Sequence, residues 1–153
     1  MELKSTLRVL NQADLKSEPG AAAGITIKNL VGNDERPTDR LGVTLATIKT
    51  GTLEHLHWHL IEAFNYVISG RAIVRDIEGR SYDIRPGTMI YAPPGIAGSH
   101  EWDVKEEVQL ISPRATTNPV VGIQFTVDQA SRQSSIDLEY LLRRGGTRFK
   151  SFY

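Results

Sequence analysis

Short segments of alternating apolar and polar residues, separated by glycine and proline, run through the chain from Leu41 onward. The stretch Ile25 to Val31 shows the same alternation and is rich in β-branched residues. Segments of this kind are typical of half-buried strands. Their close spacing, with turn residues between them, favours an antiparallel sandwich or barrel. We therefore expect an all-β fold whose core covers about residues 25–127.

The two ends of the chain differ from this pattern. Residues 1–24 are polar and small for much of their length and predict a short N-terminal arm. Residues 134–145 predict a C-terminal helix, capped by Ser134 or Ser135 and ended by Gly145. We expect this helix to pack on the outside of the β body or on a neighbouring subunit.

Length and composition bound the remaining possibilities. The chain has 153 residues, which suits a single domain over 1–153. Its 18 basic and 18 acidic residues balance, so charge gives no indication of nucleic-acid or membrane binding. Cysteine is absent, which excludes disulfides and thiolate metal sites. Because the sequence also shows no secretory signal and no apolar stretch of about 20 residues, we expect a cytoplasmic protein.

All four histidines of the chain fall in two places. His55, His57 and His59 occupy every second position of one stretch, and His100 follows a turn-rich run. Alternate residues of a strand point to the same face, about 7 Å apart along it, so an adjacent pair can converge on one ion. Neutral imidazole suits zinc, iron, nickel and manganese. The pattern predicts a divalent metal site, to which His100 is added from a distant strand.

Two motifs carry a resemblance to the cupin family. The stretch from Gly51 to Gly70 is similar to the first cupin motif, with His57 and His59 at its histidine positions. The run from Gly87 to Gly95 is similar to the second motif. The resemblance covers roughly residues 41–112. It implies a double-stranded β-helix, which is a jelly-roll barrel, often dimeric, with a divalent metal inside its mouth.

The sequence departs from the family pattern at two positions. Ala63 stands where the family has a glutamate, and Gly98 stands where it has its last histidine. Glu62 is adjacent to the first of these, but a one-residue step turns a strand side chain to the other face, unless a bulge re-aims it. His100 lies two residues after the second, which keeps it on the same face of a strand; alternatively, residues 96–99 bulge as a short insertion.

The resemblance and these departures give a predicted site. The metal ligands are His57, His59 and His100, and Glu62 is the candidate catalytic residue. Two roles remain open for His55: it replaces the missing carboxylate as a ligand, or it orients one of the ligands without contacting the ion itself. We expect Glu54 to face solvent, Trp58 to pack on the outer face and Arg114 to lie on the surface. Either Gln124 or Phe125 is expected to face the pocket.

The function that the resemblance implies is a small metal-dependent enzyme, of dioxygenase, isomerase or decarboxylase type, acting on a small organic molecule. The ion is iron, zinc, nickel or manganese. The missing glutamate keeps a second hypothesis open, which is a non-catalytic barrel that binds or senses a small ligand. A third is a structural scaffold. Outer strands and the N-terminal arm leave edges that need cover, so a homodimer is expected.

Overall fold

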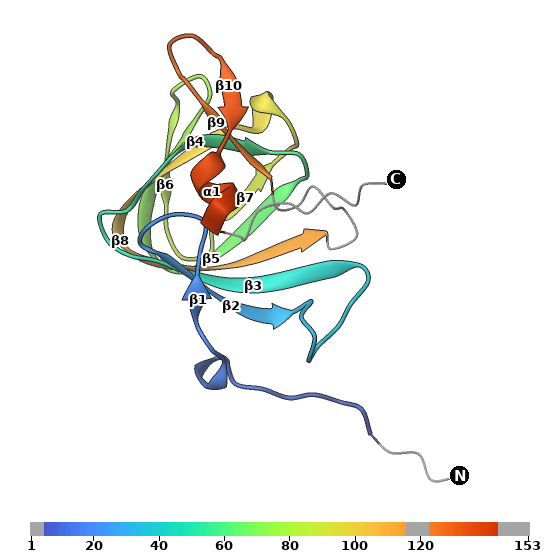
Figure 1. The fold of residues 1–153 in the computed structure, drawn as a ribbon. Coiled ribbons are helices and arrows are strands. Elements are labelled where there is room, and N and C mark those ends of the chain that lie inside the picture. The colour runs from blue at the N-terminus through green and yellow to red at the C-terminus, as the bar shows by residue number, and fades with distance from the viewer. Residues whose placement is uncertain (1–4, 116–122, 144–153) are drawn as a thin grey trace, which may run out of the picture.

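The structure is a computed structural model that describes residues 5–115 and 123–143. Most of this part of the chain is β-strand, arranged in one curled antiparallel sheet (Figure 1). The strands are β1 (Glu18–Pro19), β2 (Ile25–Val31), β3 (Leu41–Ile48), β4 (Leu53–His59), β5 (Ala63–Asp76), β6 (Ser81–Ile84), β7 (Met89–Ala92), β8 (His100–Ala115), β9 (Gln124–Val127) and β10 (Ser134–Ile136). The helices are the 3-10 turns η1 (Gln12–Asp14) and η2 (Ile96–Gly98) and the α-helix α1 (Leu138–Arg143).

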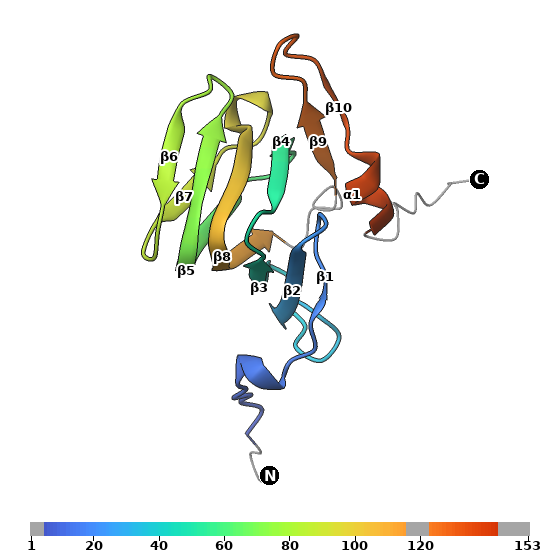
Figure 2. The same ribbon diagram turned by 90° about the vertical axis from the view of Figure 1, so that its left-hand side faces the viewer.

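Two long strands hold the sheet together. β8 pairs along its length with β5, and on its other edge it pairs first with β4 and then with β3. The order β1-β2-β3-β8-β4-β9-β10 follows one path through the sheet, while β6 and β7 pair with β5. Figure 2 shows β5, β6, β7 and β8 as one layer, with β4, β9 and β10 on the other side. The predicted all-β fold, a cupin-type barrel, is confirmed.

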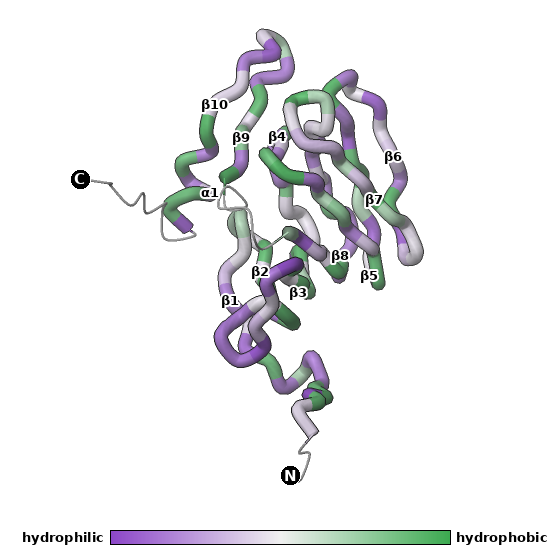
Figure 3. The backbone as a smooth tube through the Cα atoms, turned by 90° about the vertical axis from the view of Figure 1, so that its right-hand side faces the viewer, coloured by the Kyte–Doolittle hydropathy of each residue, from purple (hydrophilic) through white to green (hydrophobic). Residues whose placement is uncertain are grey.

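The hydrophobic core is built on inward positions of β2, β3, β5, β6 and β8. Buried alternate residues, visible as changes of hydropathy along the strands in Figure 3, supply it. Its buried members are Ile25, Ala46, Ile48, Val67, Ala72, Val74, Ile84, Trp102, Val104, Val108 and Leu110. Within the described residues, no helix is long and apolar enough to cross a membrane.

The C-terminal prediction is wrong in its boundary. Ser134–Ile136 do not begin a helix but form β10, which pairs with Phe125–Val127 of β9. The helix begins at Leu138, because the side chain of Asp137 accepts a hydrogen bond from the backbone N–H of Tyr140 at 2.9 Å and so caps its first turn. The predicted end, at Arg144 and Gly145, lies outside the described residues.

Candidate metal centre

Strand β4 carries His55, His57 and His59 and lies between β8 and β9. His57 is directly opposite His100 of β8, and His59 is directly opposite Gln124 of β9. Residues two apart on a strand, and residues directly opposite each other on neighbouring strands, share a face of the sheet. Three strands from distant parts of the sequence thus bring four polar side chains to one inner face.

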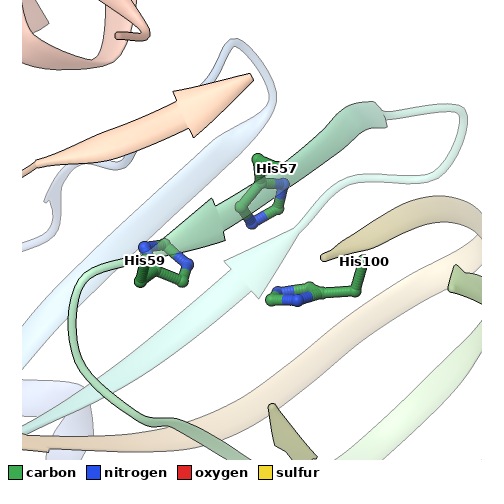
Figure 4. Close-up of side chains that lie close together, drawn as sticks. All are labelled: His57, His59 and His100. Atoms are coloured by element: carbon green, nitrogen blue, oxygen red, sulfur yellow. The ribbon is translucent and has the colours of Figure 1, made fainter. Parts of the chain in front are cut away.

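The three imidazoles converge in one small space (Figure 4). The ring of His57 lies 5.1 Å from that of His59 and 4.4 Å from that of His100, between centroids. One nitrogen of each ring lies within 4.8 Å of the others. Among the described residues, this is the group of histidine and acidic side chains placed to hold a metal ion. The predicted histidine triad is therefore brought together.

Two of the rings are oriented by the backbone. The Nδ1–H of His57 donates to the carbonyl oxygen of His55 at 2.7 Å, and the Nδ1–H of His100 donates to that of Gly98 at 3.0 Å. Each bond leaves the Nε2 lone pair for a ligand, as metal-binding histidines require. The short turn η2 supplies the second carbonyl and so positions His100.

Burial keeps all three rings neutral at physiological pH. It lowers the pKa of His57 to about 4 and the pKa of His100 to about 4. The pKa of His59 falls to about 2, because burial and then repulsion from the other two rings disfavour its charged form. A metal ion needs unprotonated imidazole, so the site holds its donors in the binding state.

A β-bulge in β4 changes which of its side chains face the cluster. Glu54 is opposite Trp102 and His57 is opposite His100, so three steps on β4 match two on β8. The extra residue puts Glu54 on the face of His57, and it leaves the side chain of His55 exposed. Only the backbone carbonyl of His55 contacts the site, through its bond to His57.

The expectation that Glu54 faces solvent is wrong. Its side chain is 11% exposed, and its Oε1 lies 3.8 Å from Nε2 of His57. Burial raises the pKa of the Glu54 carboxyl, against the opposing attraction of His100 and Arg114. No sequence signal marked this position, since regular alternation assigns Glu54 to the face opposite the histidines.

The structure does not bring Glu62 to the cluster. Glu62 is exposed in the turn before β5 and is not part of the cavity wall. Its neighbour Ala63 is buried and pairs with Ala92 of β7. Asn65, two residues further along β5, is the residue of this segment that reaches the cavity, and sequence reasoning missed it.

The histidines lie on the wall of a cavity of about 270 Å³. Arg114 contributes to this wall, contrary to the expected surface position, and its Nη1 donates to the carbonyl oxygens of Phe64 and Pro113. Other polar groups of the wall are Asn29, Thr44, Glu54, Asn65, Ser112, Gln124 and Tyr140. A cavity with an apolar lining and several convergent polar groups suits a small polar molecule.

Gln124 faces the cavity, and its neighbour Phe125 faces away. Phe125 stacks on Trp58 with 4.2 Å between ring centroids, which confirms that Trp58 packs on the outer face. The Nε2 of Gln124 donates to the Asp137 carboxylate at 3.4 Å, while its buried Oε1 has no partner. An unsatisfied buried oxygen beside neutral imidazoles fits a cation or its bound water. The donor set therefore fits a divalent ion.

Comparison with known proteins agrees with this geometry. The family model described as the cupin domain matches residues 44–112. No curated protein matches the chain. The chain is similar in structure to the polyketide cyclase RemF from Streptomyces resistomycificus, at 20% identity, TM-score 0.64, and coverage of 74% of this chain and 81% of that one.

Two further solved structures are similar. A sugar phosphate isomerase of the cupin superfamily from Silicibacter pomeroyi has 18% identity, a TM-score of 0.61, and coverage of 94% of this chain and 98% of its own. Ectoine synthase from P. lautus has 19% identity, a TM-score of 0.56, and coverage of 70% and 76%. At such identities these structures support the fold alone. The matched family model, with His57 and His59 at the histidine positions of its first motif, assigns residues 44–112 to the cupin superfamily.

Proposed function

We propose that this cupin is a metal-dependent enzyme of the isomerase or lyase kind, acting on a small polar organic molecule. The observation that carries the proposal is the convergence of three neutral imidazoles on the wall of a polar cavity. The structural neighbours named above as a cyclase, an isomerase and a synthase are enzymes of the same fold, which supports an enzymatic role without assigning a reaction here.

The residues divide the work of the site between them. His57, His59 and His100 would hold the ion, and a bound ion would supply Lewis-acid polarisation of a substrate oxygen. Asn65 and Gln124 offer amide groups that orient the substrate beside the histidines. The Arg114 guanidinium on the same wall favours a substrate with a negatively charged group. The surrounding apolar side chains limit the water that reaches the reacting atoms.

The metal's identity tests the reaction class. Zinc, nickel or manganese agrees with Lewis-acid chemistry, whereas iron would favour the alternative dioxygenase reading. The other alternative, a barrel that binds a small ligand without turning it over, is favoured by Ala63 at the family's glutamate position.

The deciding experiment is metal content by elemental mass spectrometry on untagged protein. We expect close to one divalent ion per chain in the wild type and in a His55→Ala control, and little in a His57→Ala, His59→Ala double variant. A wild type that stays metal-free after reconstitution with zinc, iron, nickel and manganese would contradict the metalloenzyme proposal. It would leave the ligand-binding barrel as the better account.

A cytoplasmic location stays a prediction. We also propose that the protein is a homodimer. The N-terminal segment extends from the sheet in Figure 1 and exposes the apolar side chains of Leu7, Val9 and Leu10. Exposed apolar groups of this kind are commonly covered by another chain. Sedimentation at micromolar concentration should give the mass of two chains, and a monomer would contradict the proposal.

A further inference from the structure

Glu54 is a buried acidic side chain at the metal centre that the family motif does not contain. The motif's own glutamate position is Ala63, which has no donor atom, and Glu62 beside it is exposed. Glu54 instead precedes the histidines on the same strand, β4, and lines the same cavity. We propose that Glu54 is the fourth protein ligand of the ion. This inference rests on the proposed metal site.

The bulge explains how a residue at this position reaches the ion. Glu54 and His57 are three apart, and a regular strand would turn them to opposite faces. Because two residues of β4, His55 and Leu56, lie against one of β8, Glu54 regains the inner face opposite Trp102. The bulge thus turns the side chain of Glu54 toward the histidines. The sequence had suggested that a bulge could turn Glu62 in the same way.

The distances and charges around Glu54 favour a cation. Its Oε1 is 3.8 Å from Nε2 of His57. Because Nδ1 of His57 is bonded to the His55 carbonyl, this Nε2 is the nitrogen available to a metal ion. Burial is the largest influence on the pKa of Glu54 and raises it. Arg114 and a side-chain hydrogen bond with Gln124 favour the charged carboxylate, whereas Asp137 repels it. Burying a carboxylate is costly unless a cation compensates its charge. A divalent ion between the imidazoles and Glu54 supplies that charge.

The ligand set then has the same composition as that of the family motif, although its carboxylate comes from a different strand. Three histidines and one carboxylate are gathered, but the carboxylate comes from β4 rather than β5. Gln124, opposite His59, points an unpartnered oxygen into the same space. This leaves the β5 side of the cavity, where Asn65 lies, for substrate.

The test compares Glu54→Gln with Glu62→Gln, since both remove one carboxylate charge with little change in shape. The dissociation constant for Zn²⁺ is measured by chelator competition, and the visible absorption of the Co²⁺ form reports the ligand set. We expect Glu54→Gln to weaken Zn²⁺ binding by at least about 10-fold and to change the Co²⁺ spectrum. Glu62→Gln should match the wild type in both.

Each outcome has a distinct meaning. Wild-type Zn²⁺ affinity in Glu54→Gln overturns the inference and leaves the histidine site intact. Weaker binding with an unchanged Co²⁺ spectrum also overturns it, because Glu54 would then act only through another ligand. A wild type that binds neither ion contradicts the proposed function itself. Circular dichroism and thermal unfolding of the metal-free proteins establish that Glu54→Gln is folded.

Discussion

The pairing with β8 is irregular at one place in β4 and at one place in β5, and the two irregularities have different effects. In β5, the buried residues stand at odd-numbered positions up to Val67 and at even-numbered positions from Ala72 onward. The alternation changes because the pairing with β8 shifts around Gly70. Both flanks of this shift pack in the apolar core. In β4, the bulge instead returns Glu54 to the face of the histidines. One irregularity fits the sheet to its core, and the other aims a side chain at the site.

The two also differ in how they are marked in the sequence. Gly70 has φ 87°, and a Cβ there would clash with the carbonyl oxygen of Glu107, so only glycine fits. The bulge in β4 is formed by His55 and Leu56, neither of which has a positive φ. The glycine is visible in the sequence, although β5 continues through it without a turn, whereas a bulge of ordinary residues leaves no mark.

The largest expected effect of a single substitution is at the glycine-marked irregularity. Gly70→Ala should lower the free energy of unfolding by more than about 3 kcal/mol, because it adds a backbone clash to an unfavourable φ. Gly87→Ala is the matched control. Gly87 has the same φ of 87° but open space around its Cβ position, so we expect a cost of only about 1 to 2 kcal/mol. Urea unfolding of both variants measures the difference, and equal losses would show that φ alone matters.

The second effect is a pH dependence that the buried histidines give to the metal-free protein. The pKa of His57 and of His100 is about 4 in the folded state, that of His59 is about 2, and all three are about 6.5 unfolded, so the unfolded state binds more protons between these values. Their contribution to stability is complete above pH 6.5 and is lost as pH falls toward 4. The loss is roughly 3 kcal/mol for each histidine.

Urea unfolding in chelator from pH 7.5 to pH 4.5 measures this dependence. The raised pKa of Glu54 acts in the opposite direction, so Glu54→Gln should steepen the loss toward low pH. A His57→Gln, His100→Gln variant keeps only His59 of the cluster, so its profile should be flatter than that of the wild type. If its profile has the wild-type slope, the histidines are not the groups that titrate.

A smaller effect is expected at the buried residue of the β4 bulge. Leu56 is 6% exposed and does not line the cavity, so its side chain anchors the bulge from the face away from the histidines. Leu56→Ala should cost about 2 to 3 kcal/mol of unfolding free energy, as for other buried leucines. Thermal unfolding in excess Zn²⁺ and in chelator should show this loss in both conditions. A loss found only with Zn²⁺ would mean that Leu56 acts on the site and not on the fold.

Much of the fold could be predicted because it depends on local pattern. Alternation, glycine and proline located the strands from Ile25 to Val127, and the histidine spacing located His57 and His59 on one face. His100 was added on the assumption that it shares a strand with the motif position two residues before it, but that position, Gly98, lies in the turn η2 and β8 begins at His100. The C-terminal helix was misplaced because Ser134–Ile136 pair with β9, a long-range contact that no local signal reports.

The acidic part of the site could not be predicted for a related reason. Assigning Glu54 to the outer face required only that β4 be regular, and the bulge at His55 and Leu56 breaks that condition. The positions of Asn65 and Arg114 on the cavity wall depend on how β5 and β8 curl toward each other. Curvature of a sheet is set by all its strands together. Such positions need the structure.

The smallest expected effect separates the backbone of the β4 bulge from its side chains. The His55 side chain is exposed, and its carbonyl alone contacts the site by accepting the 2.7 Å bond from His57. His55→Ala keeps that carbonyl, so Zn²⁺ affinity should stay within about 2-fold and unfolding free energy within about 0.5 kcal/mol of wild type. Chelator competition and urea unfolding measure both quantities. A loss of Zn²⁺ affinity comparable to that of His57→Ala would make the His55 imidazole a ligand and place Glu54 outside the ligand set, since the bulge cannot aim both residues at one ion.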